Sequence, residues 1–197
     1  MWDERYTKPG YLFGTEPADY LKREAVRLEP GSRVLCVADG EGRNSVHLAL
    51  LGHEVTAFDA SGVGLEKARK LAATAGAKVD FHQAGIEDWD WSQQYDAVIG
   101  IFIQFAPPDL RAKFFRWMAQ AVRPGGLLLL HGYAPRQVEN GTGGPPDSAN
   151  MYTMDMLRDA FAGWDILHID DYDAEIDEGP GHSGMSALVD LVARKPG

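Results

Sequence analysis

Residues 34–44 read VLCVADGEGRN, an apolar run followed by a turn with two glycines one residue apart. The run from Arg33 to Ala38 predicts a buried strand, and the segment from Gly42 to Leu51 predicts a helix. Glycines at such a junction let the backbone approach a ligand closely, and the first turn of the helix offers free N–H groups. The stretch therefore predicts a nucleotide-binding turn between a strand and a helix.

The same alternation of apolar runs and amphipathic segments continues along the chain. It predicts strands at 54–59, 78–83, 95–102 and 127–131, and helices at 61–75, 108–122 and 153–161. Two last strand-like runs, 164–176 and 185–194, are joined by DEGPGHSG and predict a hairpin. We therefore expect an α/β protein whose Rossmann-like, seven-stranded sheet is mostly parallel, with a C-terminal antiparallel hairpin strand and helices on both faces.

Composition narrows the functional classes. The chain has 197 residues and a formal net charge of −10, which predicts one domain, residues 1–197, and disfavours a nucleic-acid partner. Cys36 is the only cysteine, so an intrachain disulfide is impossible, and no zinc or other metal site is expected. The first residues resemble no signal peptide, and no window is apolar enough to span a membrane. We expect a cytoplasmic monomer or homodimer that acts on a small-molecule substrate.

In a sheet of this kind, ligands bind at the carboxyl ends of the strands, so the loops that follow strands hold the candidate site. Asp59 ends the second strand, where a carboxylate can accept both ribose hydroxyls of an adenosine, or can serve as a turn residue before Ser61 and Gly62. The loop after the third strand, 84–88, can flank a purine with Ile86 against the ring.

The segments VLCVADGEGRN, VTAFDAS, QAGIEDW, YDAVIGIF and VRPGGLLLL follow one another in the motif order of class I S-adenosylmethionine-dependent methyltransferases, which the chain resembles from Arg33 onward. The opening WDERYTKPGYLFGTEPADYL and the segment GEGRNSVHLALLGHEVTAFDAS resemble the tellurite-resistance and thiopurine-type branch of small-molecule methyltransferases. The resemblance implies S-adenosyl-L-methionine as cofactor and a thiol, selenol or tellurite-type oxyanion as acceptor. It also implies an N-terminal helical cap, residues 1–30, that folds over the cofactor. The expected cofactor-binding residues are Asp39, Gly40, Gly42, Asn44, Asp59, Ala60, Gly85, Ile86, Glu87 and Ile101.

The first motif departs from the pattern V-L-D-x-G-C-G-x-G of the family. Cys36 replaces the acid within the strand, Ala38 replaces the first glycine, and Asp39 occupies the place of a small residue. Cys36 is expected to be a buried strand residue and not a nucleophile. Asp39 can serve the methionine ammonium or sulfonium of the cofactor, or it can bind N–H groups of its own loop.

The acceptor site is expected on the loops after the later strands. His182, in the glycine-rich hairpin loop, is the preferred catalytic candidate, as a general base or a thiolate-stabilising cation, ahead of His131 and Tyr133. The segment 134–152 is long and rich in glycine, which predicts a substrate lid, although an exposed surface loop has the same composition. The expected substrate-binding residues are Gln104, Phe105, Tyr11 and Glu178.

Three other functions compete with methyl transfer to a small molecule. An NAD(P)-dependent oxidoreductase shares the glycine turn, but Ser45 in place of a third glycine and the C-terminal hairpin speak against it. A non-catalytic regulator that binds an adenosine cofactor would share the same turn. A macromolecular methyltransferase is disfavoured by the acidic charge and by Ala106–Asp109, which lacks the Asn/Asp-Pro-Pro-aromatic pattern of enzymes that methylate nucleic-acid amines.

Overall fold

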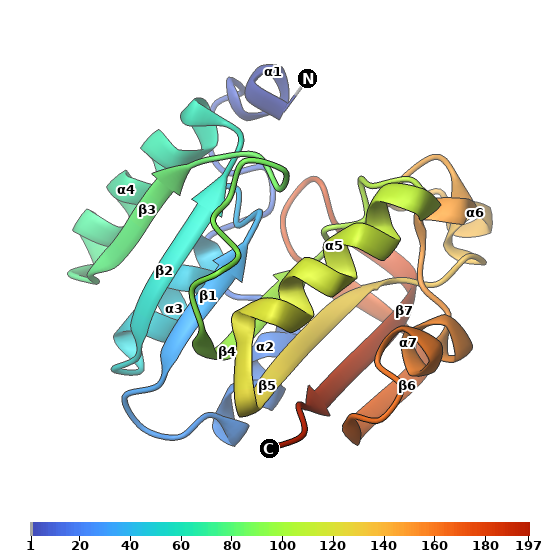
Figure 1. Cartoon of the computed structure of the whole chain (residues 1–197). Helices are drawn as coiled ribbons and strands as arrows, with labels where there is room; N and C mark the ends of the chain where they lie inside the picture. The colour runs from blue at the N-terminus through green and yellow to red at the C-terminus, as the bar shows by residue number, and fades with distance from the viewer. Residues whose placement is uncertain (1) are drawn as a thin grey trace.

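The computed structural model describes residues 2–197 and contains one seven-stranded sheet in the order β3-β2-β1-β4-β5-β7-β6 (Figure 1). The strands are β1 (Arg33–Val37), β2 (Glu54–Asp59), β3 (Val79–Gln83), β4 (Tyr95–Ile101), β5 (Val122–Tyr133), β6 (Asp165–Asp177) and β7 (Ser183–Arg194). In this part of the chain β7 is antiparallel to both its neighbours and the other strands run parallel. The Rossmann-like fold predicted from the sequence is confirmed. Met1, which belongs to the expected cap and domain, lies outside the described residues.

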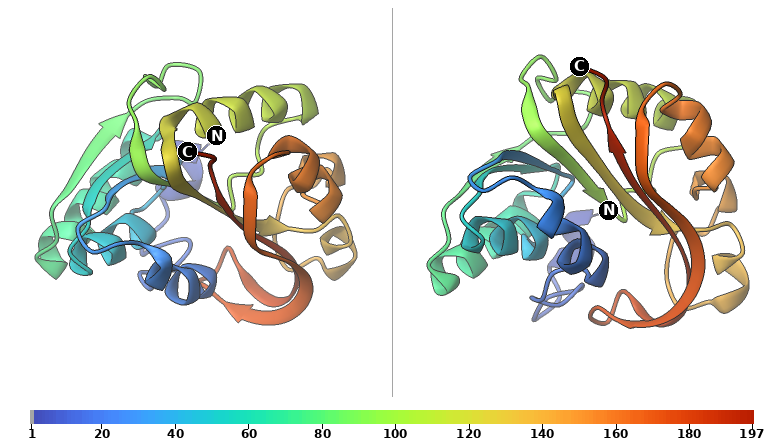
Figure 2. Two further views of the ribbon diagram at one scale, coloured as in Figure 1. Left: turned by 60° about the horizontal axis from the view of Figure 1, so that its bottom comes forward. Right: turned by 90° about the horizontal axis from the view of Figure 1, so that it is seen from below.

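Helices cover both faces of the sheet (Figure 2). One face packs against α5 (Pro108–Ala121) and α7 (Met154–Ala160). The other packs against α2 (Asp19–Glu24), the 3-10 turn η1 (Ala25–Arg27) and α3 (Arg43–Leu50), and α4 (Gly62–Ala75) lies beside α3 and β3. Such double coverage is typical of a parallel sheet and requires strands that are apolar on both sides.

The central strand β1 shows how this sequence meets that requirement. Leu35 and Val37 point into the core under α5, whereas Val34 and Cys36 point into the core under α2 and α3. Successive side chains of a strand alternate between its faces, so the continuous apolar run fills both layers at once. Cys36 is buried, as expected, and burial raises the pKa of its thiol.

Strand β5 begins earlier than the sequence suggests. The expected strand 127–131 is the middle of β5, and the Pro124-Gly125-Gly126 turn lies inside the strand as a register shift on β4. Tyr95 pairs with Val122 and Ala97 pairs with Leu127, so four residues bulge out between these two pairs.

The two segments expected to cover the site contain little regular structure. Residues 2–30 form α1 (Trp2–Tyr6), an irregular stretch, α2 and η1, and are not one helical cap. Within 134–152 the chain forms only the single turn α6 (Gln137–Asn140) and η2 (Ser148–Asn150). Helices α1 and α6 lie at the end of the molecule where the parallel strands terminate, whereas α2 lies toward the other end (Figure 1).

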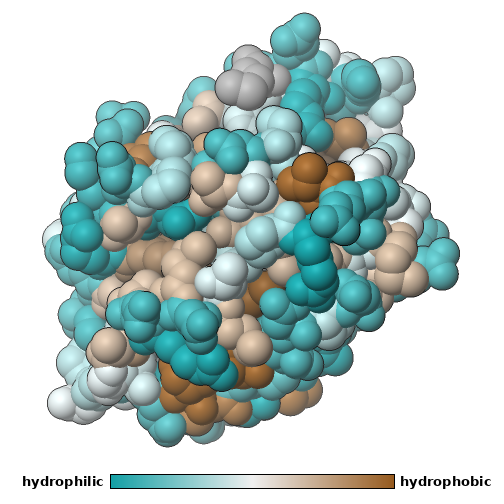
Figure 3. Space-filling view, turned by 90° about the vertical axis from the view of Figure 1, so that its right-hand side faces the viewer, coloured by the Kyte–Doolittle hydropathy of each residue, from teal (hydrophilic) through white to brown (hydrophobic). Residues whose placement is uncertain are grey.

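Strand β6 forms one edge of the sheet, and it is strongly acidic. Arg136 pairs with Asp171 and Asp173 of this strand. The side of the molecule that carries β6 is mixed, with hydrophilic side chains around small hydrophobic groups (Figure 3). Charges on an edge strand discourage pairing with another sheet. Among residues 2–197, no helix is both long and apolar enough to cross a membrane.

Candidate functional site

A cavity of about 670 Å³ opens at the carboxyl ends of β1, β2 and β4. Its volume lies within the range of small-molecule sites, and the place is the one that the fold favours for ligands. The expected residues that line it are Asp39, Gly40, Asn44, Asp59, Ala60, Gly85, Ile86, Glu87, Ile101, Gln104, Phe105, Tyr133 and His182.

The carboxylate of Asp59 fixes the glycine turn. Its Oδ2 accepts a hydrogen bond from the Gly40 N–H at 2.9 Å, and its Oδ1 accepts one from the Ser61 N–H at 2.8 Å. A carboxylate has about four lone-pair positions, so each oxygen keeps room for a ligand hydroxyl. Asp59 thus organises the turn and also lines the cavity, and its binding of a ribose stays a prediction.

Asp39 leaves β1 pointing toward the cavity, where Ser45 Oγ donates a 2.5 Å hydrogen bond to its Oδ2. Burial raises the pKa of Asp39 to about 7, and the neighbouring charge of Asp59 acts in the same direction. The carboxyl therefore favours any cation that enters the cavity, since a positive charge would stabilise its ionised form.

The loop between β3 and β4 forms the far wall. Ile86 lines the cavity and its carbonyl accepts a 2.8 Å hydrogen bond from Trp91 Nε1, which fixes the turn from the core side. Beside it, the rings of Phe58 and Trp89 stack at 4.4 Å. Glu87 and Asp88 line the same wall. An apolar surface flanked by carboxylates suits a flat ring with an exocyclic amine.

The N-terminal strap, residues 2–14, closes one side of the cavity with Trp2, Arg5, Tyr6 and Phe13. It is fastened to α4 by Lys67, whose Nζ donates to Lys8 O at 2.9 Å and Gly10 O at 2.6 Å. The same ammonium pairs with Glu41 Oε1 at 2.8 Å, and Glu41 Oε2 accepts the Leu12 N–H at 2.7 Å.

His182 lines the cavity beside the strap, in the loop between β6 and β7, which reaches back to the middle of the sheet (Figure 1). Its Nδ1 is 3.0 Å from the hydroxyl of Tyr133, and its ring meets Phe102 and Phe13 edge to face at 4.0 and 4.4 Å. Burial and the charges of Arg43, His131 and Arg5 lower the pKa of His182 well below its usual range.

A buried ion pair holds this loop in place. Arg43, from α3, donates to Glu178 Oε2 at 2.8 Å, and Glu178 Oε1 accepts the Asp19 N–H at 3.1 Å. Nearby, the Gly181 N–H donates to Leu12 O at 2.8 Å. Hydrogen bonds and an ion pair thus connect the strap, the start of α3 after the glycine turn, and the loop between β6 and β7, although these segments are far apart in the sequence. We call this connected set of segments the frame of the site.

Four of the expected site residues lie outside the cavity lining. Gly42 begins α3, where an added Cβ would lie 2.7 Å from Ala68 Cβ, so it serves the packing of α3 on α4. His131 is buried against Asp190, with Nδ1 and Oδ1 2.6 Å apart. Tyr11 Oη donates to Lys67 O at 3.3 Å, and Glu178 is committed to Arg43.

Gln104 lines the cavity, but its amide is already in use. It donates to Tyr133 O at 2.8 Å and accepts from Tyr133 N at 2.6 Å, and it therefore ties the end of β4 to the end of β5. Phe105, which follows it, remains partly exposed and packs near Phe114 at 5.9 Å. Of the two, Phe105 has the freer surface.

Several lining residues were not expected from the sequence. Arg43 and Phe102 come from the same turns as expected residues, whereas Gly143–Pro146 and Asn150 come from within the 134–152 segment. Backbone conformation gives one further signal: Ala38 and Phe102, at the ends of β1 and β4, have φ of +49° and +55°. A left-handed backbone conformation raises the free energy of any residue other than glycine, and such residues cluster at ligand sites. Ala38 replaces the first glycine of the expected motif.

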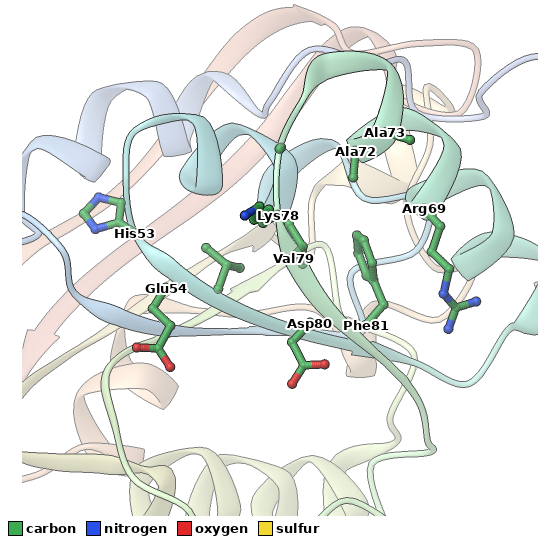
Figure 4. A pocket seen from close by; sticks show the side chains of 11 residues that line it. His53, Glu54, Arg69, Ala72, Ala73, Lys78, Val79, Asp80 and Phe81 are labelled. Carbon is green, nitrogen blue, oxygen red and sulfur yellow. The ribbon is translucent and has the colours of Figure 1, made fainter.

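A second depression lies at the amino ends of β2 and β3 (Figure 4). The carboxylates of Glu54 and Asp80 point to the same side there, and the guanidinium of Arg69 lies apart from both. Since no polar groups converge in it, and the strands begin rather than end beside it, the cavity described above is the better candidate site.

Comparison with known proteins finds a family model that matches part of the chain. Residues 34–126, from β1 to the start of β5, match the family described as a methyltransferase domain. The match covers slightly less than half of the chain. The matched range contains the glycine turn, Asp59 and the 84–88 loop, whereas Tyr133 and His182 lie beyond it.

The relatives of known sequence include a methyltransferase. The chain is 36% identical over 133 residues to the ubiquinone biosynthesis O-methyltransferase of Xanthomonas axonopodis pv. citri, an alignment that covers 66% of this chain and 54% of that protein. The chain thus spans about half the length of the curated relatives that it matches.

Solved structures share the fold over most of the chain. A structure from work on the conversion of a disulfide bond into a thioacetal group during echinomycin biosynthesis has a TM-score of 0.79 at 24% identity, covering 99% of this chain and 90% of that one. The structure of TehB from Haemophilus influenzae has a TM-score of 0.73 at 18% sequence identity, and the match covers 98% of this chain and 65% of that one. The structure of magnesium protoporphyrin IX methyltransferase from Synechocystis PCC 6803 with bound SAH has a TM-score of 0.69 at 18% sequence identity. The match covers 89% of this chain and 79% of that one. At these identities the likeness establishes the fold.

Proposed function

We propose that this protein transfers a methyl group from S-adenosylmethionine to a small molecule that bears a soft nucleophile: a thiol, a selenol or a tellurite-type oxyanion. The observation that carries the proposal is a single cavity with two chemically different ends. One end is a glycine turn with Asp39 and Asp59, and the other is an aromatic enclosure around His182 and Tyr133.

The residues of the first end fit this cofactor. The free lone pairs of Asp59 suit the ribose hydroxyls, and Ile86 with Glu87 suits an adenine ring and its amine. The ionisable carboxyl of Asp39 suits the positively charged methionine portion. The methyltransferase-domain match over residues 34–126 and the SAH bound to the magnesium protoporphyrin IX methyltransferase support the same cofactor.

The second end supports a small acceptor. Its walls are apolar and aromatic, and the strap and residues 143–146 restrict the cavity to a molecule of modest size. The formal net charge of −10 disfavours a nucleic acid. The fold shared with TehB is consistent with the tellurite-resistance branch, and the thioacetal-forming neighbour with sulfur chemistry. Methyl transfer needs mainly orientation and exclusion of water, which such an enclosure supplies.

Two measurements test the proposal. In thermal-shift titrations, S-adenosylhomocysteine should stabilise the protein and NAD or NADP should not, because a bound ligand raises the melting temperature. Stabilisation by the nicotinamide cofactors alone would overturn the proposal in favour of an oxidoreductase. Incubation with S-adenosylmethionine and a panel of thiols, selenols and tellurite should then release S-adenosylhomocysteine with the methylated acceptor. Cofactor binding without turnover on any of them would favour a non-catalytic regulator.

A further inference from the structure

The imidazole of His182 is held rigidly on one side and left open on the other. Nδ1 faces the Tyr133 hydroxyl at 3.0 Å, and Phe102 and Phe13 clamp the ring edge to face. Nε2 has no hydrogen-bond partner within residues 2–197, and the residue lines the cavity although only 6% of its surface is exposed. An oriented imidazole with one unused nitrogen facing a cavity has the geometry of a proton acceptor.

The groups around His182 determine which proton it can take. Arg43 of α3, Arg5 of α1 and His131 of β5 oppose a positive charge on the imidazole, while Glu178 balances Arg43. Burial also raises the pKa of the Tyr133 phenol, so its hydroxyl stays protonated. The ring is therefore neutral at neutral pH and ready to accept a proton, but it is a weak base. A weak base can assist a thiol, whose ordinary pKa is about 8.5, far better than an alcohol.

We propose that His182 Nε2 is the general base that takes the proton of a thiol acceptor during methyl transfer, with Tyr133 as the positioning residue. The inference rests on the proposed function and narrows its acceptor. As the thiol sulfur forms its new bond to the methyl carbon, the bond from that carbon to the sulfonium breaks and its electron pair stays on the leaving sulfur. The thiol proton moves to Nε2, so the products are a thioether, S-adenosylhomocysteine and a protonated imidazole that returns its proton to water.

The base distinguishes the thiol from the other two proposed acceptors. A selenol or an oxyanion is already ionised at neutral pH and gains nothing from a proton acceptor, whereas an alkyl thiol is mostly protonated. The residues that line the cavity also indicate which chemical groups the acceptor carries besides its thiol. Phe102 packs on His182, and Phe105, Leu110 and Pro146 line the same cavity, which suits an aromatic or aliphatic thiol without charge.

Substitution of His182 by Gln, with two thiols of similar size, tests the role directly. Phenylmethanethiol is protonated at neutral pH, and 4-nitrothiophenol is ionised. With the first thiol, H182Q should lower kcat by about 100-fold or more, the usual contribution of a general base. With the second thiol the loss should stay below about threefold, because no proton remains to be removed. The matched control is H47Q, at a half-buried position of α3 outside the cavity lining, which should leave both rates unchanged.

A measurement on the wild-type protein removes the dependence on a well-folded variant. In the complex with S-adenosylhomocysteine, the ¹⁵N spectrum of labelled histidine should show His182 neutral at pH 7, with the proton on Nδ1, donated to Tyr133 Oη, and a bare Nε2. Y133F should lower kcat about tenfold with KM nearly unchanged, because the base is misplaced while acceptor binding is retained.

The outcomes separate the two proposals. Equal losses with both thiols in H182Q, no loss with either, or a proton found on Nε2 would overturn the role of His182 while leaving methyl transfer intact. Methylation of a selenol or tellurite but of neither thiol would also overturn the role of His182. Failure of the wild-type protein to bind S-adenosylhomocysteine, or to methylate any thiol, selenol or tellurite, would instead overturn the proposed function. H182Q should bind S-adenosylhomocysteine as the wild type does, which shows that the variant is folded.

Discussion

Lys67 fastens the N-terminal strap, so its replacement by Met should release the strap without unfolding the sheet. The ammonium donates three hydrogen bonds, to Lys8 O, Gly10 O and Glu41 Oε1, at 2.6–2.9 Å. Met retains the apolar stem that packs along α4 and removes all three donors. At about 1 kcal/mol net for each hydrogen bond, the strap should lose about 3 kcal/mol of local stability. Glu41, which is buried, is then left without its counter-ion, which adds to the loss.

Amide hydrogen exchange measures this change where it occurs. A loss of about 3 kcal/mol corresponds to roughly 100-fold faster exchange of strap amides through local opening, with the Leu12 N–H, which donates to Glu41, as the reporter. Amides of β1 and β4 should keep their protection. The control is K70M, one turn along α4, where the side chain is exposed. Exchange of the Leu12 amide in K67M within about threefold of the wild-type rate would refute the role assigned to Lys67.

Three further substitutions probe other parts of the frame. G42A should lower the free energy of unfolding in urea by about 2–4 kcal/mol, since its Cβ would meet Ala68 and its φ is +88°; an unchanged midpoint would contradict this. D190N should lower the free energy of unfolding by about 3 kcal/mol in the same assay, because it leaves His131 beside a neutral group in the core. A decrease of less than about 1 kcal/mol would mean that the pair of His131 and Asp190 is unimportant for stability. The pKa of Asp39 is raised to about 7 in the folded protein, so the ligand-free protein should lose stability as pH rises from about 4 to 7. D39N should abolish that loss and melt higher than wild type at pH 8, and parallel melting curves for the two proteins across this pH range would contradict the shift.

Local sequence patterns were sufficient to predict the strands of the sheet and their order along the chain. The apolar run of β1 alternates between two buried layers, and the strand–helix alternation that follows leaves few topologies. The position of His182 also followed from topology, because β6 runs parallel to the central strands and its loop must emerge at the ligand end. The glycine turn was placed correctly, although only Gly40 of its two glycines faces the cavity.

Contacts between distant segments could not be predicted from the sequence. Arg43 and Glu178 are separated by 135 positions, and nothing local to either indicates that they pair. His131 appeared equivalent to His182 because both end or follow a strand at the ligand side. Only the packed structure shows that Asp190 and Tyr20 enclose His131, whereas His182 keeps a free nitrogen. Side-chain direction depends on the neighbours that fill the space, and periodicity alone does not supply them.

The central claim is that one cavity holds S-adenosylmethionine at the glycine turn and its acceptor at His182. A crystal structure with S-adenosylhomocysteine bound tests this most directly. The ribose is expected on Asp59, the adenine against Ile86 and the sulfur facing the enclosure of His182 and Tyr133. S-adenosylhomocysteine bound elsewhere, or bound with its sulfur turned away from both side chains, would contradict it.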